Sequence, residues 1–306
     1  MKVMVFDVGG TEIKYSVMDE QMHRTDSGAV PTPQDTQAQF LDTLYRLYAP
    51  HKDEVTGIAM ALPGFVDNRT GYVSNGGALL YNTATPVGQL LAEKCGCPVI
   101  LENDGKAAAM AELANGALKG CCNAAVFIIG TGVGGGIIAN GQLVRGVHFT
   151  AGEYSFVNTN AEAWDAPDQN MACQCSTRNL LKWYRARKAL PENAPLDGRS
   201  FFAAANAGEP EALEVLRRFC HAVAVQIFNL TVLLDVEKVA IGGGISKQPL
   251  LLESLRSAYD GLFTSRAGQA YMEGLPRCQI VPCAFSSEAN QVGVAAAYFE
   301  AMQKKC

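Results

Sequence analysis

Apolar residues fall in short runs that end in glycine at several points along the chain. Residues 2–7 are apolar enough to form a buried strand, a glycine turn follows, and residues 13–18 have the pattern of its hairpin partner. A second apolar run at 124–129 ends in the glycine-rich residues 130–136, and residues 137–139 continue as the partner strand. This recurrence predicts an internal duplication.

Helical and strand periodicities alternate around the two hairpins. Between them the pattern predicts helices at 35–48, 86–94 and 106–114, and strands at 55–61 and 98–101. A helix from Pro210 carries apolar residues at helical spacing that we expect to face the core, namely Leu213, Leu216, Phe219, Val223, Ile227, Leu230 and Leu234. A short strand at 239–241 and a helix at 289–304 follow. Such alternation predicts sheets covered by helices.

Two further features of the second half are expected to have contrasting roles. Residues 153–177 are polar, contain proline and show little periodicity, so they predict a long functional loop rather than a packed element. His221 lies within the long helix without a second metal ligand at helical spacing, and we interpret it as structural.

Length and charge narrow the class of protein. A chain of 306 residues favours two lobes, here 1–118, completed by a terminal helix at 289–306, and 119–288, with a cleft between them. The net charge of −5 and the absence of a basic run argue against nucleic-acid binding. No apolar stretch reaches the roughly 20 residues that span a bilayer. With no signal peptide after Met1, we expect a cytoplasmic protein whose ten cysteines are reduced.

The first glycine turn has the parts of a phosphate site. Asp7 ends the strand, and Gly9, Gly10 and Thr11 offer close backbone N–H groups and a hydroxyl. The Asp7 carboxylate is able to orient hydrated magnesium. A plain tight hairpin is the alternative interpretation. Walker and dinucleotide-binding motifs do not fit, because both need a helix directly after the glycines.

Two more glycine clusters follow predicted strands. Runs with so few side chains destabilise a turn unless a ligand approaches the backbone closely, so we expect phosphate at the first cluster and the nucleoside at the second. The residues concerned are Gly130, Thr131, Gly132, Gly134 and Gly135 in the first cluster, and Gly242, Gly243 and Gly244 in the second.

These motifs together resemble the ROK family of bacterial sugar kinases and sugar-responsive repressors, within the actin/hexokinase superfamily. The resemblance covers the whole chain and rests on motifs in the family's order: Asp7-Val-Gly-Gly-Thr-Glu-Ile-Lys14, Leu62-Pro63-Gly64, Glu102-Asn103-Asp104, Gly130-Thr-Gly-Val-Gly-Gly135, Ala151-Gly152-Glu153 and Ile241-Gly-Gly-Gly244. It implies a two-lobed, actin-like (ribonuclease H-like) α/β fold with duplicated mixed sheets flanked by helices. It also implies ATP, Mg2+ and a sugar as ligands, and a homodimer.

The resemblance also assigns roles to individual residues. Asp104 is the expected catalytic base, which agrees with chemistry, because a sugar hydroxyl is a poor nucleophile until a carboxylate accepts its proton. Asn103 is expected to orient the sugar hydroxyls, although it also suits the N-cap of the next helix. The implied sugar site comprises Gly64, Asn75, Gly76, Gly77, Asn103, Asp104 and Glu153. The implied nucleotide site adds Lys14 to Asp7 and the glycine clusters.

One motif departs from the family pattern. Where the family reads Gly-Glu-Ile-Gly-His, the chain reads Gly152-Glu-Tyr-Ser-Phe156, so the Glu is kept and the His is lost. Cys173 and Cys175 remain of the family's zinc cysteines, but Ser176, Asn179 and Leu180 replace the rest of that motif. Two thiols do not complete a structural zinc site, so we expect none here. An aromatic residue in place of the His, and Gly76-Gly77-Ala78-Leu79, are similar to the β-glucoside kinase branch.

The function therefore has one leading hypothesis and open alternatives. We expect transfer of the ATP γ-phosphate to O6 of glucose or of a glucosyl unit in a β-glucoside. Glucose, N-acetylmannosamine and fructose remain possible acceptors within the family. A sugar-sensing repressor is disfavoured, because such proteins place a helix-turn-helix before the phosphate hairpin, whereas the first strand here starts at Lys2. A non-catalytic sugar-binding protein is the third hypothesis.

Overall fold

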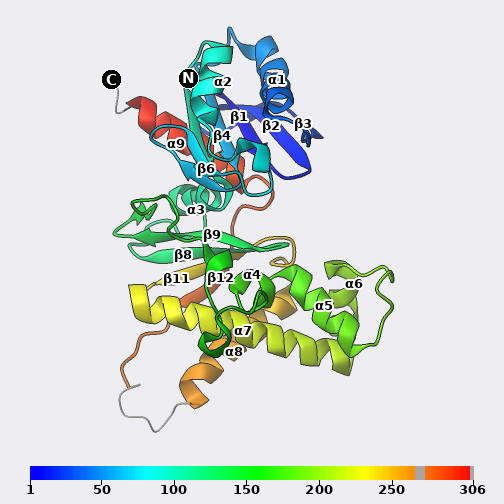
Figure 1. The fold of residues 1–306 in the computed structure, drawn as a ribbon. Coiled ribbons are helices and arrows are strands. Elements are labelled where there is room, and N and C mark those ends of the chain that lie inside the picture. The colour runs from blue at the N-terminus through cyan, green and yellow to red at the C-terminus, as the bar shows by residue number, and fades with distance from the viewer. Residues whose placement is uncertain (266–272, 304–306) are drawn as a thin grey trace. The chain divides into compact units, whose positions relative to one another are not determined.

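The computed structural model describes residues 1–265 and 273–303, which form two compact units (Figure 1). The first unit comprises Met1–Gly116, Leu143–Ala151 and Ser287–Cys306. The second comprises Ala117–Gln142 and Gly152–Ser286. The short segment Leu143–Ala151 is a departure from the division expected from the sequence, because the chain leaves the second unit there, packs with the first and returns.

The first unit is built on a five-stranded mixed sheet in the order β3-β2-β1-β4-β7. β1 pairs antiparallel with β2 and parallel with β4, and β4 pairs parallel with β7. Every residue of β4 is buried, as expected of a central strand covered on both faces. The strands are β1 (Lys2–Val8), β2 (Glu12–Asp19), β3 (Arg24–Pro31), β4 (Ile58–Leu62) and β7 (Val99–Asn103).

Helices from both ends of the chain cover this sheet. The C-terminal helix packs on α3 so closely that a Cβ atom on Gly293 would lie 1.7 Å from the carbonyl oxygen of Ala107. Glycine is therefore required at this helix crossing. The helices are α1 (Gln37–Tyr48), α2 (Val87–Cys95), α3 (Asp104–Asn115) and α9 (Ala289–Gln303), and a two-stranded ribbon, β5 (Phe65–Asp67) with β6 (Tyr72–Asn75), completes the unit.

The second unit repeats this topology. Its sheet has the order β10-β9-β8-β11-β12, with β8 antiparallel to β9 and parallel to β11, and β11 parallel to β12. The strands are β8 (Ala124–Ile129), β9 (Val133–Ala139), β10 (Gln142–Leu143), β11 (Lys238–Gly242) and β12 (Gln279–Pro282). The predicted duplication and the predicted mixed sheets flanked by helices are confirmed.

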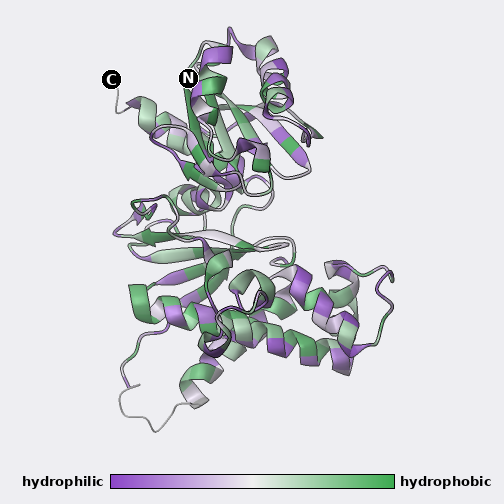
Figure 2. Ribbon diagram, viewed as in Figure 1, coloured by the Kyte–Doolittle hydropathy of each residue, from purple (hydrophilic) through white to green (hydrophobic). Residues whose placement is uncertain are grey.

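The long helix α7 (Pro210–Leu234) is the main support of the second sheet, and its banded colouring in Figure 2 follows its amphipathic sequence. Leu216, Phe219, Val223 and Ile227 are buried, as predicted. Leu213 is not, because its side chain is 39% exposed at the edge of the stripe, where Ala212 and Val215 face the core instead. The other helices are α4 (Met171–Gln174), α5 (Thr177–Arg187), α6 (Gly198–Asn206) and α8 (Pro249–Ser265).

Two further predictions need correction. α3 begins at Asp104 rather than at Lys106, because the side chain of Asn103 caps it by accepting the Lys106 N–H at 3.0 Å. Residues 153–177 are not an unpacked loop, since they contain short helical turns and α4, and their Tyr154 and Met171 side chains are buried. Among the helices described, none is long and apolar enough to cross a bilayer.

Candidate functional site

The turn between β1 and β2 is held through its carbonyl groups. Thr32 Oγ1 donates to the carbonyl of Gly9 at 2.8 Å, and Gln34 Nε2 donates to the carbonyl of Gly10, also at 2.8 Å. The N–H groups of Gly10 and Thr11 have no acceptor within the part of the chain that the structure describes. A rigid turn with two unsatisfied donors is suited to bind phosphate oxygens.

Asp7 lies at the end of β1, directly before this turn. Burial raises the pKa of its carboxyl group, and a hydrogen bond from Asn290 Nδ2 at 2.9 Å and the charge of Lys14 oppose that rise. Lys14 faces Asp7 across the β1–β2 ladder. A buried carboxylate beside a predicted phosphate site is suited to bind a divalent cation, because the cation would stabilise the negative charge that burial disfavours. Asn290 was missed from the sequence, because it lies on α9 at the opposite end of the chain.

Three predicted sugar-site glycines join two loops of the first unit. Gly64 has φ +100°, and a Cβ atom there would lie 2.0 Å from the carbonyl oxygen of Asn75. Gly77 has φ +57° and faces Gly64 in return, while a Cβ on Gly76 would lie 2.1 Å from the carbonyl oxygen of Leu79. Packing therefore requires these glycines, and Asn75 beside them is exposed.

The β7–α3 junction carries the expected catalytic base. Asn103 is buried and uses its side chain twice, accepting the Lys106 N–H and donating from Nδ2 to the carbonyl of Gly64 at 3.0 Å. Asp104 follows as the first residue of α3, half-buried, and accepts the Gly105 N–H at 2.7 Å. A helix N-terminus favours a negative charge, which is the form that a general base requires.

The predicted phosphate turn and the predicted sugar loop lie side by side within the first unit. A Cβ atom on Gly10 would lie 3.1 Å from Cβ of Ala78, the residue that follows the Asn75–Gly77 loop. The fold of one unit therefore brings the turn that follows Asp7 next to a loop of the predicted sugar site.

The second unit contributes the turn between β8 and β9. Thr177, the first residue of α5, donates its N–H to the carbonyl of Gly130 at 2.9 Å. On the other side Ser155 Oγ accepts the Val133 N–H at 3.3 Å and donates to the Val133 carbonyl at 2.8 Å. Thr131 stays exposed at the tip of this fixed turn. Ser155 and Thr177 were not identified from the sequence, because serine and threonine are common in loops.

The glycines of the second unit divide into two groups. Gly135 has φ +144° and Gly243 has φ +96°, and a Cβ atom on them would lie 1.8 Å and 2.1 Å from the carbonyl oxygens of Val126 and Ile129. A Cβ on Gly242 would lie 2.6 Å from Ile128 Cδ1. Backbone contacts and positive φ require glycine at Gly135 and Gly243, so their lack of a side chain is not a sign of a ligand, whereas the contact of Gly242 is with the end of a side chain. Among the predicted nucleotide-site glycines of this unit, those whose Cβ position meets no atom closer than 3.4 Å are Gly130, Gly132, Gly134 and Gly244.

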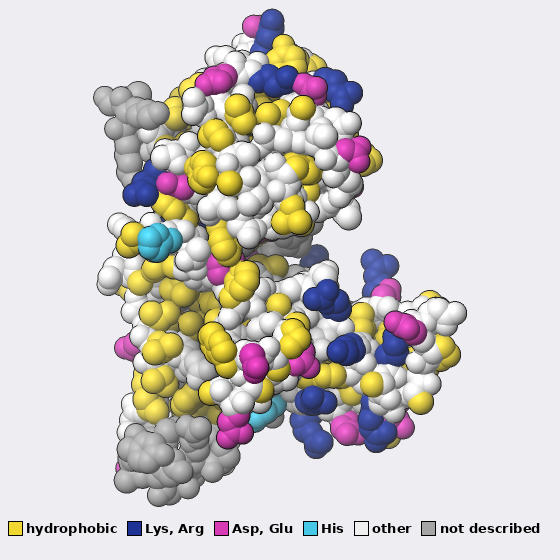
Figure 3. Space-filling model, in the orientation of Figure 1, with side chains coloured by type: hydrophobic (Ala, Val, Ile, Leu, Met, Phe, Trp, Pro, Cys, Tyr) yellow, Lys and Arg dark blue, Asp and Glu magenta, His cyan; other side chains and the backbone are white. Residues whose placement is uncertain are grey.

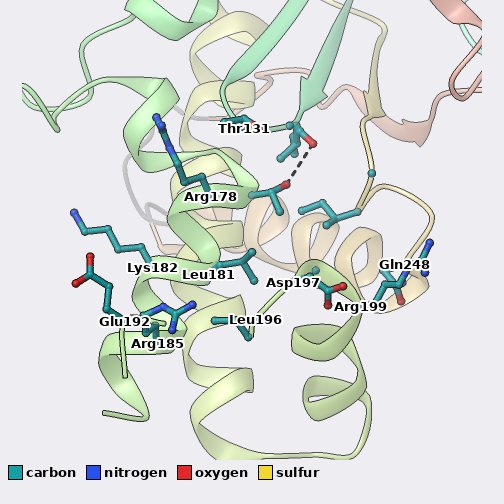
Figure 4. Close-up of a pocket in the computed structure, with 16 residues that line it drawn as sticks. Thr131, Arg178, Leu181, Lys182, Arg185, Glu192, Leu196, Asp197, Arg199 and Gln248 are labelled. Carbon is teal, nitrogen blue, oxygen red and sulfur yellow. Dashed lines mark hydrogen bonds between the residues drawn. The ribbon is translucent and has the colours of Figure 1, made fainter. Parts of the chain in front are cut away.

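A cavity of about 930 Å³ opens beside the second group (Figure 4). Gly130, Thr131, Gly244 and Ile245 are among the residues that line it, so two predicted nucleotide clusters meet there. Leu181, Leu196 and Ile245 supply apolar surface. The volume and the mixture of apolar and polar lining are typical of a site for a nucleotide-sized ligand.

Basic side chains from α5 also line this cavity. Figure 3 shows Lys and Arg gathered over the part of the second unit that carries α5 and α6. Arg185 donates to the carbonyls of Pro191 and Ala194, so it fixes the connection to α6. Arg178 and Lys182 line the cavity one helical turn apart, where a nucleotide's phosphates or polar edges would meet them. Their four-residue spacing is the sequence signal that could have identified them.

Glu153 stands beside an aromatic pair whose members behave differently. Tyr154 is buried, stacks edge-on against Phe127 with ring centroids 4.5 Å apart, and donates its hydroxyl to the carbonyl of Gly136 at 3.1 Å. Phe156, which stands where the family has His, is 69% exposed. Glu153 itself is half-buried and precedes the short helical turn Tyr154–Phe156. The turn therefore buries the ring of Tyr154 and leaves the ring of Phe156 exposed to solvent.

The remaining cysteines of the zinc motif have structural environments. Cys175 is buried, and burial raises the pKa of its thiol to about 12, which disfavours the thiolate that zinc binds. Ser176 caps α5, and Asn179 and Leu180 are buried in it. No group of three potential ligands occurs among the residues described. Each replaced position thus has a packing or capping role.

Comparison with known proteins places these features in a family context. The model of the ROK family matches residues 3–303. The chain is 30% identical over 258 residues to a β-glucoside kinase of Listeria innocua, with 84% of this chain and 87% of that protein covered. Its fold matches a ROK family protein from Streptococcus pneumoniae in complex with sucrose (TM-score 0.87, 28% identity, 99% and 100% covered). It also matches a ROK family glucokinase from Streptomyces griseus in complex with glucose and AMPPNP (TM-score 0.78, 25% identity, 97% and 99% covered).

Proposed function

Because the chain belongs to the ROK family and is a carbohydrate kinase, we propose that it transfers the γ-phosphate of ATP to O6 of a glucosyl unit, preferentially in a β-glucoside, with Asp104 as general base. The placement of Asp104 is the observation that carries the proposal. Its carboxylate stands at the first position of α3, held by the Asn103 cap, beside the loops of the predicted sugar site. In phosphoryl transfer a side chain is needed mainly to accept the proton of the attacking hydroxyl, because the rest of the catalysis is positioning and charge stabilisation.

The phosphates of ATP would be bound by backbone donors. In the first unit the N–H groups of Gly10 and Thr11 support this assignment. In the second unit, considered by itself, the turn at Thr131 is the candidate. Mg2+, when bound, neutralises negative charge on the phosphates, and Asp7 would hold it through water. The adenosine would occupy the cavity between Gly130 and Gly244, with Arg178 and Lys182 at its wall.

The acceptor assignment rests on Phe156. An imidazole at this position would offer the sugar a hydrogen bond, whereas the exposed phenyl ring offers a face on which a second sugar ring or an aryl group can stack. Loss of the imidazole favours an acceptor with a substituent at its anomeric carbon. Glucose, N-acetylmannosamine and fructose are the alternative acceptors, and Glu153 would bind sugar hydroxyls in each case.

An ATP-coupled assay across glucose, cellobiose, gentiobiose, fructose and N-acetylmannosamine tests the function. We expect kcat/KM for cellobiose or gentiobiose to exceed that for glucose by about tenfold, since a stacked second ring adds about 1 to 2 kcal/mol. The Phe156→Ala variant should lose that preference and keep activity on glucose. A wild-type preference for glucose would exclude the β-glucoside assignment and leave the kinase assignment intact.

The catalytic base is tested in the same assay. Asp104→Asn should lower kcat by about a hundredfold to ten-thousandfold while the thermal midpoint stays near that of the wild type. Asp53→Asn, an exposed Asp of the same unit, is the matched control and should leave kcat unchanged. Unchanged turnover in Asp104→Asn would exclude this residue as the base, and ADP release with no sugar at all would exclude the kinase proposal.

A further inference from the structure

A buried carboxylate lies immediately before the residues that carry the proposed chemistry. Glu102, on β7, is 1% exposed, and its side chain is surrounded by donors. Arg145 Nε donates to Oε2 at 2.8 Å, and its Nη2 lies 2.8 Å from the same oxygen in an ion pair. The Asn103 N–H donates to Oε1 at 3.1 Å, and Asn68 Nδ2 lies 3.4 Å from Oε2. The Arg145 contact is a charge-assisted hydrogen bond, which is stronger than a neutral one.

Arg145 comes from the segment Leu143–Ala151, which groups with the first unit although the chain on both sides of it belongs to the second. Its Nη2 atom also lies 3.4 Å from Sδ of Met110 on α3, so the guanidinium contacts both β7 and α3, on either side of the junction. The carbonyl of Arg145 accepts the Ala151 N–H at 3.2 Å, which closes the segment into a loop directly before Gly152 and Glu153.

The Glu102 pair therefore contacts two segments of the first unit, each of which directly precedes a residue of the proposed function. In one direction it holds the backbone of Asn103, whose side chain fixes the Gly64 loop and caps the helix that begins at Asp104. In the other it holds the loop through which the chain reaches Glu153. Burying an ion pair seldom stabilises a fold more than apolar residues of the same size would, so stability alone is a weak reason for this pair.

We propose that Glu102 and Arg145 are positioning residues for phosphoryl transfer: their ion pair sets the position of Asp104 and of the loop leading to Glu153. The inference rests on the proposed function. Misplacing a reacting group by about 1 Å costs on the order of a hundredfold in rate, so loss of the pair should appear in kcat. It should leave KM for ATP unchanged, because neither residue of the pair lines the nucleotide cavity or hydrogen-bonds to the turn at Gly10 and Thr11.

The test is a double-mutant cycle of Glu102→Gln, Arg145→Met and the double variant, with kcat, both KM values and thermal midpoints measured. Each single variant should lower kcat by about tenfold to a hundredfold, and the double variant should be no slower than the slower single one, because both remove the same interaction. Arg145→Lys, which keeps the charge on a partly exposed position, should recover part of the rate.

The matched control is Arg24→Met, which removes another Arg–Glu pair of the first unit, with Nη2 2.7 Å from Oε1 of Glu288. Its kcat should stay within about twofold of the wild type, as expected for an exposed pair. Additive effects in the cycle, or a lowered thermal midpoint with kcat unchanged in Arg145→Met and Arg145→Lys, would overturn the inference.

Hydrogen exchange keeps this test separate from that of the proposed function. If the wild type phosphorylates no sugar, the proposed function fails, and the exchange rate of the Lys106 amide, which Asn103 protects, still reports on the pair. Faster exchange in Glu102→Gln and Arg145→Met, but not in Arg24→Met, would support positioning of the junction. Equal protection in all variants would refute it.

Discussion

The contrast between Gly243 and Gly244 gives the most direct test of how the glycine clusters are used. A Cβ atom on Gly243 would lie 2.1 Å from the carbonyl oxygen of Ile129, about 1 Å closer than real contacts allow, and the residue has φ +96°. On Gly244 a Cβ would meet no atom within 4 Å, and the residue lines the cavity. Alanine at the two positions should therefore have opposite consequences.

The magnitudes follow from these contacts. In Gly243→Ala the backbone conformation costs about 1 to 2 kcal/mol, and displacing the Ile129 strand end costs about 1 to 3 kcal/mol more. A loss of about 2 to 5 kcal/mol lowers the thermal midpoint of a unit of this size by about 4 to 20 °C. Gly244→Ala should shift stability by no more than about 0.5 kcal/mol. Its methyl group enters the cavity, so KM for ATP should rise by roughly tenfold.

Differential scanning calorimetry and ATP-saturation kinetics on both variants decide the matter. A stable Gly243→Ala protein with a raised KM for ATP would contradict the packing explanation for Gly243. A Gly244→Ala protein with wild-type KM would contradict the placement of the nucleoside in the cavity. The two results are independent, because one reports on the fold and the other on the ligand.

Three further variants test separate parts of the structure. Asp7→Asn should raise the thermal midpoint at pH 7 while lowering kcat. Burial raises the pKa of Asp7, so the wild type loses stability as the pH rises from the pKa of about 4 in the unfolded chain through the higher pKa in the folded protein. Calorimetry from pH 3 to 8 should show this loss in the wild type and not in the variant. Tyr154→Phe removes a buried hydrogen bond to Gly136 and should cost about 1 kcal/mol in urea unfolding; no change would place the hydroxyl in water. Phe219→Ala should cost about 3 to 5 kcal/mol, whereas Leu233→Ala, at a 76% exposed side chain, should cost under about 0.5 kcal/mol; equal losses would contradict the assigned core.

The elements predicted from the sequence are those whose buried residues form a simple pattern, either a continuous apolar run or a helical period. β1, β4 and β8 are continuously apolar, and each has a glycine turn or a helix after it, so their pattern was sufficient. β3 gave no such signal, because most of its residues are exposed at the edge of the sheet. The early start of α3 was hidden by Gly105, a residue that usually argues against helix and is here buried inside it.

The site was predictable where chemistry determines the residue type and not where packing does. A carboxylate at Asp7 and Asp104 has few substitutes, so motif reasoning can propose both as functional residues. In the sequence, Gly135 and Gly243 cannot be told apart from Gly130 and Gly244. Only the coordinates show that a Cβ atom would clash at the first two positions and would meet no close atom at the other two. Asn290 joins Asp7 across nearly the whole chain, a partnership that no local pattern reveals.

The duplicated hairpins differ at the position of the proposed metal ligand. In the first hairpin Asp7 stands one residue before the last ladder pair, Val8 with Ile13. In the second the last pair is Ile129 with Val133, so the equivalent position is Ile128. The first turn thus combines a carboxylate with its amides, whereas the second is an uncharged cradle. A second carboxylate at Ile128 would repel the phosphates that the cradle is proposed to bind, so the repeat keeps the backbone geometry twice and the charge once.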